Sequence, residues 1–199
     1  DVAPSRGLGD VYKRQPVYFL TWFSISEGFL NVGYYSRANS LLIIGTVIAS
    51  SVGPLLYSKW SLVKGKELKL QVRRVSLLLA FVNTLLAIGL IIFAPIFIRI
   101  LYGTEYQTAA PVLRLLALTM IANGAKEVSY GILSSQGSPL SIMKNLVIGI
   151  ILSAILNYFI IPQFGVIGCS VVTVLVTFTT AFLLPVSYTH LRAHETELH

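Results

Sequence analysis

Residues Val75–Leu101 read VSLLLAFVNTLLAIGLIIFAPIFIRIL, an apolar run with a single charged residue, Arg99. A helix needs about 20 apolar residues to cross the roughly 30 Å hydrocarbon core of a bilayer, and this run is longer than that. The run also contains Pro95, which has no backbone N–H and therefore predicts a kink near the end of the helix. The stretch predicts a transmembrane helix.

Other apolar runs of similar length predict further membrane spans. They cover Tyr35–Leu56, Ala109–Leu133, Leu140–Ile161 and Gly165–Leu184, and a shorter run at Val17–Ser26 is expected to be the end of another helix. Buried helices of a large soluble protein would not follow one another with connectors this short. The predicted fold is therefore all-α, a polytopic membrane helix bundle with five complete spans and the end of a sixth.

The composition supports this prediction. Of the 199 residues, 55% are hydrophobic and 12% are charged, and the mean hydropathy is +0.76. Soluble domains have about a quarter of their residues charged, so a chain this apolar needs lipid around it. Its one cysteine, Cys169, lies in an apolar run and has no second cysteine with which to form a disulfide.

The basic residues, which give a net charge of +7, are concentrated in one connector. Residues Lys59–Arg74 hold six basic residues and one acidic residue, and residues 134–144 on the same side add another lysine. On the opposite side, residues 27–37 and 99–108 each pair one arginine with one glutamate. Basic loops stay in the cytoplasm, so Lys59–Arg74 is expected there. Nucleic-acid binding would need basic and aromatic residues interleaved on a soluble face, so no nucleic-acid partner is expected.

Both ends of the chain, residues 1–15 and 185–199, are expected to lie outside the membrane domain. Ser5–Gln15 (SRGLGDVYKRQ) and Val186–Thr196 (VSYTHLRAHET) are polar and directly adjoin apolar runs. Opposite strands of one nucleotide string can encode both peptides, and that string resembles a transposon-type sequencing-library adapter. The two ends are therefore predicted to be adapter-derived tails, which leaves residues 16–184 as the membrane domain.

Residues 16–184 offer few groups for catalysis. All histidines and aspartates of the chain lie in the two tails, and the acids that remain are Glu27, Glu67, Glu105 and Glu127. Without histidine or aspartate, the segment lacks the usual parts of catalytic triads, metal sites and carboxylate pairs. No catalytic residue, metal or cofactor is therefore expected, and an enzyme is disfavoured.

Polar residues inside the span Ala109–Leu133 are candidates for a substrate cavity. Lys126 and Glu127 lie well inside it, Asn123 and Tyr130 lie one turn away from them, and Arg114 lies near its start. Charges inside a span are costly and usually face a cavity or a partner. The alternative is that Lys126 snorkels towards the cytoplasmic headgroups while Glu127 pairs with a neighbouring helix.

Several other polar and small residues have simpler interpretations. Arg37 and Lys144 lie near membrane boundaries, where snorkelling is the default, although Arg37 is kept as a cavity candidate. Asn83 and Asn157 are expected to hydrogen-bond between helices. Small residues recur every four positions from Gly45, a pattern that lets two helices pack closely.

Three segments resemble those of bacterial polysaccharide flippases. They are VGYYSRANSL at Val32–Leu41, LYGTEYQTAAPVLRLLAL at Leu101–Leu118 and NYFIIPQFGVIGCSVVT at Asn157–Thr173. They occur in the order and spacing of that family. The chain thus resembles the polysaccharide-exporting branch of the multidrug/oligosaccharidyl-lipid/polysaccharide exporter superfamily.

The resemblance implies a two-lobed transporter of twelve or more helices, with this chain as its C-terminal lobe. Such proteins move undecaprenyl-diphosphate-linked oligosaccharides across the bacterial cytoplasmic (inner) membrane, for surface polysaccharides such as lipopolysaccharide O-antigen. The implied partners are the lipid-linked oligosaccharide, the lipid bilayer and other membrane proteins of polysaccharide assembly. A basic cavity would neutralise the diphosphate, which gives Arg37, Arg114 and Lys126 a part in binding it.

Two other functions stay open. A multidrug or metabolite exporter of the same superfamily is one, although cation-coupled exporters often use a membrane-embedded aspartate and residues 16–184 have none. A polymerase or ligase of envelope polysaccharides is the other. Such an enzyme would need long extracytoplasmic loops with acid and base residues, and the loops here are short.

Overall fold

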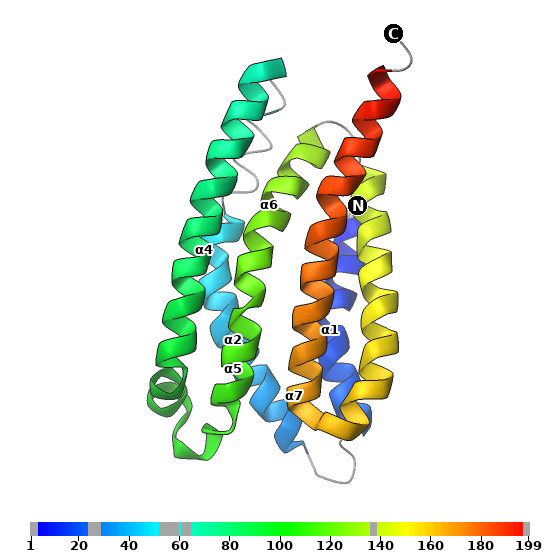
Figure 1. The fold of residues 1–199 in the computed structure, drawn as a ribbon. Helices are drawn as coiled ribbons and strands as arrows, with labels where there is room; N and C mark the ends of the chain where they lie inside the picture. Colours follow the sequence, from blue (N-terminus) through cyan, green and yellow to red (C-terminus); the bar gives the residue numbers. More distant parts are fainter. Residues whose placement is uncertain (1–3, 24–28, 52–59, 61–64, 136–138, 197–199) are drawn as a thin grey trace.

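The computed structural model describes residues 4–23, 29–51, 60, 65–135 and 139–196. In these residues every regular element is a helix (Figure 1). The elements are α1 (Pro4–Phe23), α2 (Leu30–Ser50), α4 (Gly65–Tyr102), a 3-10 turn η1 (Thr104–Tyr106), α5 (Ala109–Ala117), α6 (Thr119–Ser135) and α7 (Pro139–Thr196). The predicted all-helical class is confirmed.

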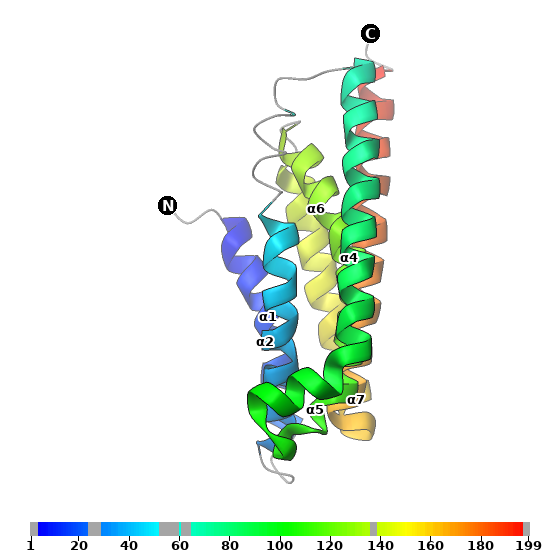
Figure 2. The ribbon, with the colours of Figure 1, turned by 90° about the vertical axis from the view of Figure 1, so that its left-hand side faces the viewer.

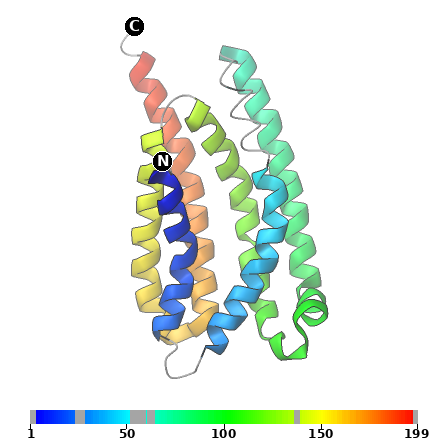
Figure 3. The ribbon, with the colours of Figure 1, turned by 180° about the vertical axis from the view of Figure 1, so that it is seen from behind.

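The long helices stand side by side and form one bundle. Figure 1 places α4, α6 and α7 towards the viewer, and the opposite view in Figure 3 brings α1 and α2 to the front. The main core lies between these two groups, where Leu20, Ala38, Ala87, Leu113 and Cys169 are all completely buried. The chain therefore packs around an apolar interior that joins its first helices to its last.

The helix α4 has the kink that Pro95 predicts. Figure 2 shows most of α4 running along the bundle and its final turns running across it. The straight part from Val75 to Ala94 has the length of about 30 Å that a membrane span requires. The kink thus turns the chain close to the point where a straight span would leave the hydrocarbon.

The helix α7 is a hairpin of two antiparallel halves (Figure 1). The turn is at Gly165, whose φ of 52° and ψ of −135° lie outside the helical region and favour glycine. At Gly168 a Cβ would lie 2.7 Å from the Cβ of Phe164, so the returning half approaches too closely for any side chain there. The two halves correspond to the predicted spans Leu140–Ile161 and Gly165–Leu184.

The predicted span Ala109–Leu133 is divided into α5 and α6 at Leu118. Leu118 keeps helical angles (φ −60°, ψ −28°), so α6 continues α5 with only a local interruption. The hydroxyl of Thr119 donates to the carbonyl of Leu116 at 2.6 Å beside this point. The sequence predicted one helix here and missed the break.

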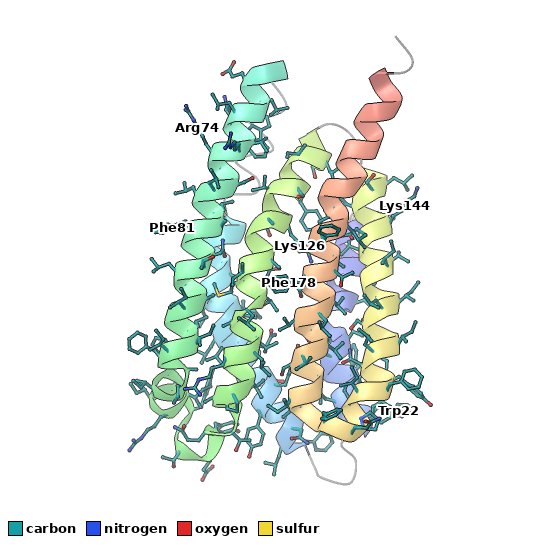
Figure 4. The ribbon with its side chains drawn as sticks, viewed as in Figure 1. Trp22, Arg74, Phe81, Lys126, Lys144 and Phe178 are labelled. Atoms are coloured by element: carbon teal, nitrogen blue, oxygen red, sulfur yellow. The ribbon has the colours of Figure 1, made fainter. Side chains whose placement is uncertain are left out.

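By length and apolar composition, two helices in the described part of the chain could cross a membrane. They are Leu70–Tyr102 and Leu140–Leu184, and the second includes the Gly165 turn and so passes along the bundle twice. Large apolar side chains such as Phe81 point outwards from α4 (Figure 4), as lipid contact requires. The span predicted at Tyr35–Leu56 is described only as far as Ser51.

Close contacts between helices occur where the chain has glycine. A Cβ at Gly45 on α2 would lie 3.2 Å from the Cε of Met120, so the expectation of close packing is confirmed at this residue. A Cβ at Gly124 on α6 would lie 3.0 Å from the Nδ2 of Asn83 on α4. The rest of the small-residue pattern after Gly45 lies outside the residues whose side chains are described.

The helices α1 and α7 also run through the predicted adapter-derived tails. The helix α1 begins at Pro4, and α7 continues to Thr196. Gln15, at the end of the first tail, is buried and donates from Nε2 to the carbonyl of Ile150 at 3.1 Å. A helical conformation says nothing about which DNA encodes a peptide, so the origin of the tails stays a prediction.

Candidate functional site

Lys126 lies on α6 inside the bundle. Its side chain is 8% exposed, and its Nζ donates a hydrogen bond of 3.2 Å to the hydroxyl oxygen of Thr180 on the second half of α7. Figure 4 shows Lys126 between these two helices. The ammonium group therefore lies among the helices, which argues against the snorkelling alternative.

Thr180 connects Lys126 to the first half of α7 as well. Its hydroxyl donates to the carbonyl of Val176 at 2.8 Å, which leaves the hydroxyl oxygen free to accept from the lysine. Its own carbonyl accepts a 3.2 Å bond from the Nδ2 of Asn145, which is 3% exposed. We call Lys126, Thr180 and Asn145 the lysine cluster; it joins α6 to both halves of α7.

The lysine cluster also contains an unused acceptor. The Oδ1 of Asn145 is buried and has no hydrogen-bond partner within the described part of the chain. A buried polar atom without a partner is costly, and such atoms in native proteins call for an explanation. The cluster therefore combines a buried cation with an acceptor that could take a further hydrogen bond.

The other candidates on α6 lie close to Lys126 along the helix. Asn123, Glu127 and Tyr130 are each partly buried. Glu127 and Tyr130 both have interaction partners, so neither is a free group. These residues lie on α6 with Lys126.

Arg37 lies away from the lysine cluster, on α2, and contacts aromatic rings. Its guanidinium carbon is 5.3 Å from the centroid of the Tyr102 ring and 5.8 Å from that of Tyr106. These are cation–π distances. The ring of Tyr34 meets the ring of Tyr106 edge-on at 6.1 Å, so the arginine is part of a tyrosine cluster that ties α2 to the end of α4.

Arg114 is also separate from the lysine cluster. It lies on α5 with an exposed side chain, and its Nε donates to the carbonyl of Ile91 on α4 at 3.1 Å. The sequence had grouped Arg37, Arg114 and Lys126 as cations of one cavity. The structure places the three cations on three helices, α2, α5 and α6, and gives each a different partner. The sequence could not show this, because it indicates depth in a span but not the direction in which a side chain points.

The prediction that Asn83 and Asn157 bond between helices is wrong. The Nδ2 of Asn83 donates to the carbonyl of Leu79 at 2.8 Å, and that of Asn157 to the hydroxyl of Ser153 at 3.0 Å. Both bonds join residues four positions apart in one helix, where side chains are neighbours. Asn145, which no sequence pattern singles out, makes the bond between helical segments instead.

Asn145 and Thr180 were missed because each lies among other polar residues of its span: Asn145 follows Lys144, and Thr180 follows Thr179. An amide inside a span was the available signal, and the sequence has several of these without saying which faces Lys126.

Where the chain is described, no group of three or more histidine, cysteine, aspartate or glutamate side chains could hold a metal ion.

Comparisons with known proteins bear on the family. The MatE family matches residues 32–159. The uncharacterized membrane protein MJ1068 of Methanocaldococcus jannaschii is 31% identical over 145 residues, which are 71% of this chain and 29% of that protein. The probable low-salt glycan biosynthesis flippase Agl15 of Haloferax volcanii is 26% identical over 167 residues, which are 79% of this chain and 35% of that protein.

The chain spans about a third of the length of these two curated relatives. No solved structure is significantly similar to it. The MatE match covers more than half of the chain, including α2, α4, α5, α6 and the first half of α7. MatE proteins are transporters and not enzymes, as the lack of catalytic groups in residues 16–184 had suggested. The chain belongs to the MatE family of membrane transporters.

Proposed function

We propose that the intact protein is a flippase that moves lipid-linked oligosaccharide across the membrane for surface glycan synthesis. The observation that carries the proposal is the similarity, along most of this chain, to a relative named as a glycan biosynthesis flippase. The chemistry of the lysine cluster supports it. The lipid carrier, which the sequence resemblance gives as undecaprenyl diphosphate, presents a doubly charged group that hydrocarbon solvates poorly.

The lysine cluster provides two features that a diphosphate group would need. Lys126 is a buried cation with a further interaction besides its bond to the neutral hydroxyl of Thr180, and a phosphate oxygen could take the place of that hydroxyl. Lysine suits this exchange because its ammonium binds as a compact point charge with three rotatable donors. The substrate would reach it when α6 and the second half of α7 move apart during transport.

We also propose that the protein is a multi-pass protein of the cytoplasmic membrane with Lys59–Arg74 on the cytoplasmic side. The excess of basic residues in that connector supports the orientation. Both relatives named above are archaeal, so the proposal covers the cytoplasmic membrane of any prokaryote and not of bacteria alone.

The test is complementation of a flippase-deficient strain by the intact protein, scored by surface glycan. We expect Lys126→Ala to reduce export about tenfold or more at normal expression, because the buried charge is lost, and Lys126→Arg to restore part of it. Lys144→Ala is the matched control, since Lys144 is an exposed lysine on α7, and it should export normally. Full export by the Lys126→Ala protein would remove Lys126 from the proposed site.

The alternative is a multidrug or metabolite exporter of the same superfamily. It predicts that the intact protein lowers the accumulation of amphipathic drugs in the same strain and does not restore surface glycan. Measuring both quantities on one set of transformants separates the two functions.

A further inference from the structure

Pro95 leaves a backbone carbonyl of α4 without its usual partner. In an α-helix the carbonyl of Ile91 would accept from the N–H of residue 95, and proline has none. Membrane helices tolerate proline where neighbouring groups satisfy the atoms that it frees. The question is therefore which group bonds to Ile91.

Arg114 does so from another helix. Its Nε, on α5, donates to the Ile91 carbonyl at 3.1 Å. A second side chain acts beside it, because the Nε2 of Gln107, just before α5, donates to the carbonyl of Pro95 at 3.3 Å. Both bonds run from the α5 region to the kinked part of α4: Gln107 lies just before α5, and Arg114 lies in its last turn. The final turns of α4 lie across the bundle (Figure 2).

We propose that Arg114 is a positioning residue that replaces the N–H missing at Pro95 and fixes α5 to the kinked end of α4. The assignment goes beyond the proposed flippase function, because it gives Arg114 a role that requires no substrate. It also explains how an arginine can lie at the side of an apolar helix, since its Nε has a defined acceptor there. The arginine and the proline then act as one unit.

The donor atom makes a sharp test available. The Nε of arginine and the Nε2 of glutamine are separated from Cα by the same number of bonds, so Arg114→Gln keeps a donor in place and removes the charge. Arg114→Met has a similar length and offers neither donor nor charge. Pro95→Ala restores the N–H that the Ile91 carbonyl lacks, and in that background the side chain at position 114 should cease to matter.

The experiment measures thermal unfolding in detergent and glycan export for the intact protein. It compares Arg, Gln and Met at position 114, each with and without the Pro95→Ala substitution. With Pro95 we expect Met to lower the unfolding midpoint by roughly 5 °C and Gln by less than half as much. In the Pro95→Ala background, the unfolding midpoints of the proteins with Met and with Arg at position 114 should differ by about 1 °C or less. Export should follow the same pattern.

Two results would overturn the proposal. One is an equal drop in the unfolding midpoint for Arg114→Met in both backgrounds, which would mean that Arg114 acts independently of Pro95. The other is an equal loss of export for Gln and Met at unchanged midpoints, which would mean that the charge matters and the donor does not. If Arg114→Met fails to accumulate with Pro95, accumulation of the protein that carries both Pro95→Ala and Arg114→Met supports the proposal, and failure of both contradicts it.

Discussion

At the scale of single residues, basic side chains serve different purposes according to their partners. Lys126 donates to a threonine hydroxyl inside the bundle, Arg37 lies over tyrosine rings, and Arg114 donates to a backbone carbonyl. The sequence could place these cations along their helices, because depth follows from counting residues. It could not assign their partners, because Tyr102 and Ile91 come close only after α4 has packed against α2 and α5.

Thr180 gives the first test at this scale. Thr180→Val keeps the shape of the side chain but removes the hydroxyl that accepts from Lys126, so a buried ammonium loses a partner. Removing one partner of a buried hydrogen bond costs about 1–3 kcal/mol. We expect a lower unfolding midpoint for the intact protein in detergent. Thr180→Ser keeps the hydroxyl and should behave like the original protein; an equal loss for both variants would show that the methyl group is what matters.

At the scale of elements, the sequence predicted helices well and their interruptions unevenly. The Pro95 kink was predicted because proline removes a donor, and the turn near Gly165 because an apolar run ends before it and another begins. The break at Leu118 was missed because its residues favour helix and its angles remain helical. A break of that kind depends on how α5 and α6 pack against α4 and α7, which no local pattern records.

The turn of α7 gives a prediction about glycine. Gly168→Ala would place a Cβ 2.7 Å from the Cβ of Phe164 and 2.8 Å from the Cγ2 of Ile160, so the hairpin would have to open. Overpacking of this kind costs about 1–3 kcal/mol. Gly89→Ala on α4 is the matched control, because its Cβ would meet nothing within 4 Å. We expect less folded protein for Gly168→Ala only, by fluorescence-detected gel filtration; equal yields would mean that the turn adjusts at little cost.

At the scale of the whole molecule, the distribution of side chains around the bundle favours a membrane orientation. Figure 4 shows Arg74 and Trp22 at opposite ends of the bundle and Phe81 pointing outwards between those ends. Basic residues at one end and an exposed tryptophan at the other match the cytoplasmic and interfacial positions of membrane proteins. The sequence predicted this polarity from charge alone, since loop charge needs no knowledge of packing.

The orientation can be tested by labelling single cysteines in intact cells. We expect a cysteine at Gln107 to react with an impermeant thiol reagent, because it follows the kinked end of α4, and a cysteine at Lys64 to react only after the membrane is opened. The native Cys169 is completely buried and should stay silent in both conditions, which provides an internal control. Labelling of the Lys64 cysteine in intact cells would show that the orientation is the reverse of the proposed one. Because the lysine cluster lies inside the bundle, such a reversal would leave its contacts intact and change only the side from which substrate enters.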